Sequence, residues 1–149
     1  MRSGGPGGAQ CGSMCDSIRA GTHLHFAAMS SVTDYALARR AVLRDFRRGT
    51  LTRLDVCDAH PELIRAAQFI GTDIDDECPV CGETNLRLVS YVYGEKLKQA
   101  NGRAISNQAE LRKLGASCDE FACYDVEVCV ECRWNHLRRQ SLHGRLHAS

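Results

Sequence analysis

Four cysteines arranged as two C-x2-C pairs are the residues with the clearest chemistry in this chain. Cys78 and Cys81 form the first pair, and Cys129 and Cys132 form the second. Each pair places two sulfurs on one tight turn, where both can bind the same ion. Four thiolates arranged tetrahedrally suit Zn²⁺, with Zn–S bonds of about 2.3 Å. Four protein ligands leave no position for water, so the pattern predicts one structural rather than catalytic zinc ion.

The elements around the two pairs must bring them together across a spacer of 47 residues. Strand-like composition follows the first pair at 86–93 and precedes the second at 120–128, and one more strand is predicted at 133–142. Residues 107–114 predict a helix within the connection. We therefore expect a zinc-ribbon-like small antiparallel sheet with a helical insertion, over residues 73–142.

Other uses of the cysteines are less favoured by the pattern. A thioredoxin-like pair would begin a helix after a strand, whereas the first pair precedes a strand. An iron–sulfur cluster on the same four cysteines is an alternative. His136 could replace one sulfur, and Cys57, Cys118 and Cys123 could form a second site. Nine cysteines cannot all pair within one chain, which argues against a disulfide framework.

Residues 31–72 predict a helical segment of about three short helices, which makes the fold class α+β. Helix signals run over Ser31–Arg48, with Gly49 as the stop. Two shorter helices are expected at 51–59 and 61–70, the latter with Pro61 at its first position. Cys57 lies in the middle helix and is interpreted as a small buried hydrophobic residue, with a reactive thiol or an extra metal ligand as alternatives.

The first predicted helix is amphipathic, with a basic face opposite its apolar stripe. Leu43 and Phe46 belong to the apolar stripe. The basic face comprises Arg40, Arg44, Arg47 and Arg48, with Leu37 among them. A solvated surface accounts for such arginines, but an apolar residue among several guanidinium groups also suits a contact with RNA phosphates or an acidic protein surface.

A second basic group follows the last cysteine pair. Arg133, Trp134, Arg138 and Arg139 are predicted to add to the binding surface, and Tyr91, Tyr93 and His136 could stack on bases or fill a protein pocket. The formal net charge is only +1, which excludes a polybasic nucleic-acid-binding chain. Residues 73–128 carry six basic against eleven acidic side chains, so an acidic middle separates two basic ends.

The two ends of the chain carry little patterning. Residues 1–30 are Gly-rich and predict a disordered tail in which Cys11 and Cys15 are incidental. Residues 143–149 predict a frayed tail. We see no apolar run near the roughly 18 residues that span a bilayer and no export signal, so a cytoplasmic protein is expected.

Five separated motifs carry a resemblance to a known family. In order they are Val32–Arg40 (VTDYALARR), Val56–Ala67 (VCDAHPELIRAA), Cys78–Cys81 (CPVC), Leu88–Glu95 (LVSYVYGE) and Glu127–Leu137 (EVCVECRWNHL). Over about residues 31–142 the chain resembles a family of small uncharacterised actinobacterial proteins, classed as a domain of unknown function. The resemblance implies a cytoplasmic protein with paired C-x2-C motifs and brings no known enzymatic activity.

Catalytic motifs find no match in the sequence. We see no G-x-S-x-G, P-loop, strand-to-helix G-x-G-x-x-G or H-E-x-x-H pattern. The expectation is a non-enzymatic accessory factor that contacts the ribosome, RNA or the transcription machinery, without a membrane or small-molecule partner. The alternative is a zinc- or redox-responsive regulator that acts through protein–protein contacts. A nucleophilic Cys57 near His60 is a third, less favoured hypothesis.

Overall fold

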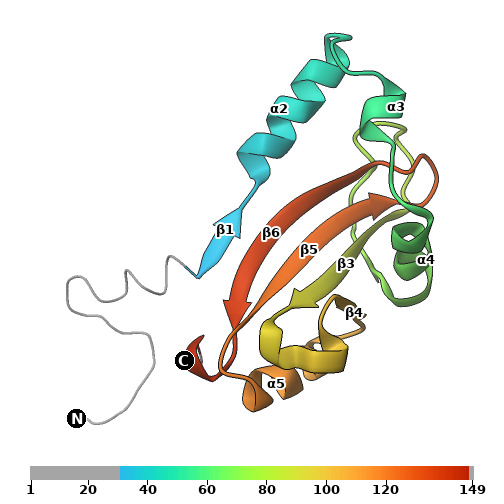
Figure 1. Ribbon diagram of the computed structural model, residues 1–149. Coiled ribbons are helices and arrows are strands. Elements are labelled where there is room, and N and C mark those ends of the chain that lie inside the picture. The colour runs from blue at the N-terminus through green and yellow to red at the C-terminus, as the bar shows by residue number, and fades with distance from the viewer. Residues whose placement is uncertain (1–30, 148–149) are drawn as a thin grey trace, which may run out of the picture.

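A computed structural model describes residues 31–147 and gives an antiparallel sheet with helices on both faces (Figure 1). The predicted disordered tail, with Cys11 and Cys15, lies outside the described residues. The strands are β1 Val32–Asp34, β2 Thr72–Asp73, β3 Leu86–Tyr93, β4 Arg103–Ile105, β5 Phe121–Cys129 and β6 Asn135–His143. Their order is β1-β6-β5-β3-β2, and β4 also pairs with β3. The α+β class is therefore confirmed.

The helices lie between these strands in the sequence. The α-helices are α2 Ala36–Arg47, α3 Arg53–Val56, α4 Pro61–Ile70 and α5 Gln108–Ser117, and the 3₁₀ helices are η2 Glu95–Ala100 and η3 Arg145–His147. Figure 1 shows α3 at the end of the sheet where β5 finishes and α5 at the opposite end. Within residues 31–147, none of the helices has the length and apolar character that would let it cross a bilayer.

The start of the first helix differs from the prediction. Residues 32–34 form strand β1, and α2 begins only at Ala36. Val32 is registered with Ser141 and Asp34 with Arg139 of β6. This pairing with a strand about a hundred residues away extends the sheet. Local helix signals could not predict it, because they depend only on neighbouring residues.

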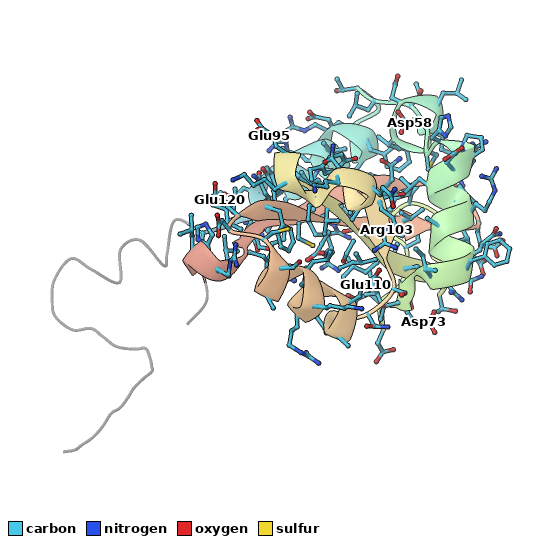
Figure 2. All side chains as sticks on the ribbon, turned by 60° about the horizontal axis from the view of Figure 1, so that its bottom comes forward. Asp58, Asp73, Glu95, Arg103, Glu110 and Glu120 are labelled. Atoms are coloured by element: carbon cyan, nitrogen blue, oxygen red, sulfur yellow. The ribbon has the colours of Figure 1, made fainter. Side chains whose placement is uncertain are left out.

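Helix ends elsewhere follow local chemistry. In α4, Pro61 occupies the first turn, and the His60 Nδ1 accepts a hydrogen bond from the Glu62 N–H. In α5, the Asn107 side chain accepts from the Glu110 N–H at 2.9 Å. Figure 2 shows Glu110 beside Arg103, and their ion pair ties α5 to β4.

Three apolar clusters hold the helices to the sheet. One joins α2 and α3 to the strands through Leu43, Val56, Leu86 and Trp134. Another packs η2 and α5 against Val92 and Phe121, and the third packs α4 against Val89 and Val128. Because side chains alternate along β3, Val89 lies on the opposite face from Leu86 and Val92. The helices therefore cover both faces, each incompletely.

The chain after His143 is structured, unlike the frayed tail that was expected there. Gly144 is buried, with φ of 118°, and η3 follows at once. The Arg145 N–H donates to the Cys118 carbonyl at 2.8 Å, and the Arg145 side chain pairs with Asp119. These contacts fasten the segment to the loop between α5 and β5 as far as His147.

Candidate metal centre

The two C-x2-C pairs form turns with matching backbone hydrogen bonds. We call residues 78–83 the first cysteine turn and 129–134 the second. The N–H of the first cysteine donates to the carbonyl five residues later, at 2.8 Å in both turns, from Cys78 and from Cys129. The N–H four residues after that cysteine donates back to its carbonyl, at 2.9 and 3.0 Å. Two segments of different sequence therefore adopt one turn geometry.

The residue after each pair is in the left-handed region, which bends the chain beneath the sulfurs. Gly82 has φ of 80° and Arg133 has φ of 74°. Glycine adopts this conformation without strain, whereas a residue with a side chain rarely does. Arg133 is held there because its guanidinium donates twice to the Ala59 carbonyl, at 3.1 and 2.7 Å.

Register in the sheet brings the two turns together. Leu86, the first residue of β3, is paired with Cys129, the last residue of β5. Both turns consequently lie at one end of the sheet, and the four Sγ atoms all lie within 4.8 Å of one another. Cys78 and Cys132 are 3.6 Å apart, as are Cys81 and Cys129. Tetrahedral thiolates at about 2.3 Å from zinc would be separated by about 3.8 Å, so the residues fit one ion.

Backbone amides point at the sulfurs in the same pattern in both turns. The N–H groups two and three residues on donate to Cys78 and Cys129, and the N–H two residues on donates to Cys81 and Cys132. The Val80 N–H lies 3.4 Å from the Cys78 Sγ. N–H donors stabilise a thiolate in preference to a thiol, which suits these sulfurs as metal ligands.

Burial acts in the opposite direction on most of the thiols. It raises the pKa of Cys78 and Cys129 to about 11 and that of Cys132 to about 12. For Cys81 burial also raises the pKa, but the Glu83 N–H and the neighbouring thiols outweigh it, and the pKa lies below its ordinary value. A bound cation favours the thiolates, so it supplies the charge compensation that the buried site otherwise lacks.

Trp134 packs against the cysteines, and Glu127 lies behind it; Trp134 was predicted on an exposed binding surface, and Glu127 was not singled out from the sequence. Trp134 is 0% exposed and packs with Cys78 and Cys129, and its Nε1 donates to Glu127 at 2.8 Å. The fully buried Glu127 carboxylate also pairs with Arg39 at 2.7 Å and Arg138 at 3.4 Å. Arg39 therefore points inward from α2, although its sequence neighbourhood looks like that of any surface arginine.

The other cysteines divide into two groups. Cys57 lies beside the centre, with its Sγ 3.6 Å from that of Cys132. Cys118 and Cys123 are buried in the cluster around Phe121 instead. The three-thiol site considered for Cys57, Cys118 and Cys123 is thus wrong. His136 stacks on Trp134 and contacts the Leu137 carbonyl, and it is not in the ligand group found within residues 31–147.

The predicted binding surface beside the second cysteine turn needs correction. Trp134 is buried, and Arg133 is bound to Ala59. Arg138 pairs with Glu127, and Arg139 pairs with Asp125 at 2.7 Å. Buried carboxylates on β5 compensate the charges of Arg138 and Arg139 within the fold, although the two side chains remain 38% and 54% exposed. The sequence contained no signal of this, because residues that meet across strands are far apart in the chain.

The predicted basic face of α2 is exposed, in contrast. Leu37 has 75% of its surface exposed. Arg40, Arg44, Arg47 and Arg48 are also exposed. Arg44 contacts Asp45 at 3.5 Å, and the other three form no ion pair with any residue of the 31–147 range.

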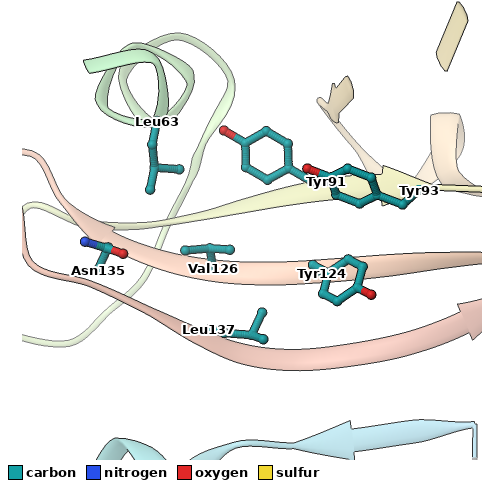
Figure 3. A pocket seen from close by; sticks show the side chains of 7 residues that line it. All are labelled: Leu63, Tyr91, Tyr93, Tyr124, Val126, Asn135 and Leu137. Atoms are coloured by element: carbon teal, nitrogen blue, oxygen red, sulfur yellow. The ribbon is translucent and has the colours of Figure 1, made fainter. Parts of the chain in front are cut away.

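An open apolar hollow lies on the sheet face that α4 only partly covers. Figure 3 shows three tyrosines facing it from β3 and β5, Tyr91, Tyr93 and Tyr124. The hollow has a volume of about 680 Å³ and is completed by Leu63, Val126, Asn135 and Leu137. Tyr91 and Tyr93 were expected to be available for stacking, whereas Tyr124 was not singled out. Alternation along β5 could have identified it.

Comparisons with known proteins place the chain in a family. Residues 26–149 match the model of a family of unknown function, DUF5318. Uncharacterised proteins of Mycobacterium bovis and Mycobacterium tuberculosis are each 42% identical over 111 residues, covering 74% of this chain and 80% of the relative. No solved structure matches the chain. The chain belongs to the DUF5318 family, as its five motifs suggested.

Proposed function

We propose that this protein is a non-enzymatic, zinc-dependent binding module of the zinc-ribbon type. The support is the convergence of Cys78, Cys81, Cys129 and Cys132 from two matching turns at one end of the sheet. Four thiolates complete a tetrahedral zinc site without water, so the ion acts structurally. The residues of this chain hold the ion, bury it against Trp134 and stiffen the end of the sheet.

The single observation that carries the binding role is the outward face of α2. Arginines near the sheet are engaged by carboxylates, as Arg39, Arg138 and Arg139 are. On α2, by contrast, three of the four outward arginines have no acidic partner among the described residues, and Leu37 lies exposed among them. An apolar side chain ringed by guanidinium groups suits a contact centre with surrounding charge-assisted hydrogen bonds.

The partner suggested by this charge is a large nucleoprotein, and we favour the ribosome over RNA polymerase. Arginine matches phosphate geometry with paired N–H donors. The acidic middle of the chain argues against wrapping along bare duplex DNA, since only one limited face is basic. Association through arginine–phosphate contacts weakens as salt rises, because counterions displaced on binding compete for the phosphates.

Charge reversal on α2 tests this role. Leu37→Asp, and separately Arg40→Glu with Arg44→Glu, are expected to abolish salt-sensitive co-sedimentation with ribosomes while zinc content stays unchanged. Leu146→Asp is the matched control, because Leu146 is 72% exposed and lies on η3, away from α2. That control should sediment as wild type does.

Two results would count against the proposed surface. Wild-type behaviour of both α2 variants would make the arginine face a solvated surface only. A parallel pull-down with RNA polymerase is the second test. If the wild type binds the polymerase and the α2 variants do not, the surface belongs to the transcription machinery instead. Tyr93→Asp, which places a charge in the tyrosine hollow, tells in the same assays whether that hollow carries the contact.

A further inference from the structure

Cys57 is a fifth thiol held against the metal centre without belonging to the ligand group. Its Sγ lies 3.6 Å from the Sγ of Cys132, the same separation that joins pairs of ligands. The four ligand sulfurs form the mutually close set, and Cys57 is outside it. When a metal is bound, Cys132 is thus the ligand that has a free thiol next to it.

Hydrogen bonds fix this juxtaposition. The Ala59 N–H donates to the Arg133 carbonyl at 3.1 Å, and the Arg133 guanidinium donates to the Ala59 carbonyl. The Asn135 side chain donates to Asp58 at 3.0 Å. The segment that follows Cys57 is therefore docked on the second cysteine turn, and the approach of the two sulfurs is part of the fold.

Access together with the position of Cys57 distinguishes this pair from the other thiols of the described part. Cys57 and the ligands Cys81 and Cys132 are half-buried, whereas the ligands Cys78 and Cys129 are buried. Of the two half-buried ligands, Cys132 has the Cys57 sulfur beside it, while Cys81 lies beside Cys129. Cys118 and Cys123 are buried in a different cluster. A small oxidant can therefore reach Cys132 more readily than the two buried ligands, and Cys57 is the nearby thiol that is not itself a ligand.

We propose that Cys57 and Cys132 form a peroxide-responsive disulfide that removes one ligand from the metal centre. Hydrogen peroxide transfers an oxygen atom to the Cys132 sulfur, which becomes a sulfenic acid while the peroxide is reduced to water. The Cys57 sulfur then attacks the Cys132 sulfur, forming the S–S bond and releasing a second water. In total two thiols lose two hydrogens and one peroxide gives two waters.

The disulfide leaves three thiolates, so the ion is released and the second cysteine turn loses its anchor. Because Cys57 captures the sulfenic acid, Cys132 is kept from further oxidation to sulfinic acid, which thiols do not reverse. The loss of zinc is therefore reversible: a thiol reductant restores the Cys132 thiol, and added zinc binds again. This inference rests on the metal centre proposed above and is independent of the α2 surface.

The test uses the full-length protein loaded with zinc under anaerobic conditions. Hydrogen peroxide is added, released zinc is followed with a coloured chelator, and disulfides are mapped by peptide mass spectrometry. Wild-type protein is expected to release its zinc, to show a Cys57–Cys132 disulfide and to rebind zinc after reduction. Cys57→Ser is expected to lose that recovery and to accumulate Cys132 sulfinic acid. Cys118→Ser, which removes a thiol from the other cluster, should behave as wild type.

Several outcomes would overturn the inference. A disulfide within a C-x2-C pair, or one that joins Cys132 to Cys11 or Cys15, would remove the role of Cys57. Full zinc recovery in Cys57→Ser would do the same. If the protein binds no zinc but still forms the Cys57–Cys132 disulfide, the proposed zinc function is refuted while the disulfide is supported. Failure of one proposal can therefore be told apart from failure of the other. If Cys57→Ser folds poorly, the disulfide map of the wild type still tests the inference, because it does not use that variant.

Discussion

Cys129→Ser is expected to unfold the described domain at room temperature. Cys129 is fully buried at the end of β5, where it is a ligand of the metal centre and part of the cluster around Trp134. Structural zinc sites contribute about 10–16 kcal/mol, which equals or exceeds a typical domain stability of about 5–15 kcal/mol. The helices should be lost with the sheet, because α2, α3 and α4 are too short to persist alone.

Circular dichroism and thermal melting measure this effect, with Cys118→Ser as the matched control. Cys118 is equally a buried cysteine, but it lies in the cluster at the other end of the sheet. It should keep its cooperative transition. A chelator strong enough to remove zinc should reproduce the effect of Cys129→Ser in the wild type. An unchanged melting curve after chelation would show that the four cysteines do not stabilise the fold.

Glu127→Ala is expected to cost about 3–5 kcal/mol of unfolding free energy, the usual cost of removing one partner of a buried ion pair. The fully buried carboxylate accepts hydrogen bonds from Arg39 and from the Trp134 indole, and it also pairs with Arg138. Removing one partner from a buried ion pair leaves the others uncompensated, which is strongly destabilising. Because Trp134 packs against the ligand cysteines, the loss should also loosen the metal centre.

Denaturant unfolding of the zinc-loaded protein measures this loss. Glu62→Ala is the control, since the Glu62 side chain is 76% exposed and its contact with Arg65 is long, at 3.9 Å. It should change stability by no more than about 0.5 kcal/mol. A cost for Glu127→Ala within that same range would mean that the buried carboxylate does not hold α2 to the sheet.

The elements near the cysteines were predictable because their signals are local. Aromatic and β-branched residues mark Leu86–Tyr93, and the predicted strand coincides with β3. Pro61 and Gly71 bound α4 as expected. The C-x2-C spacing identified all four cysteines whose sulfurs lie within 4.8 Å of one another.

What escaped prediction depends on contacts between distant residues. Strand β1 forms because it pairs with β6. The Arg39 side chain points inward because it pairs with the buried Glu127 carboxylate. The approach of Cys57 to Cys132 depends on the docking of residues 57–59 onto Arg133. Trp134 looked like an exposed stacking residue for the same reason: only the assembled cluster shows that it is covered.

The most direct test of the zinc site is elemental analysis of protein purified anaerobically without added metal. We predict one zinc ion per chain in the wild type and in Cys57→Ser, and its loss in Cys81→Ser, a variant that changes a ligand at the less buried edge of the centre. Iron with acid-labile sulfide, or no metal in the wild type, would contradict the proposal.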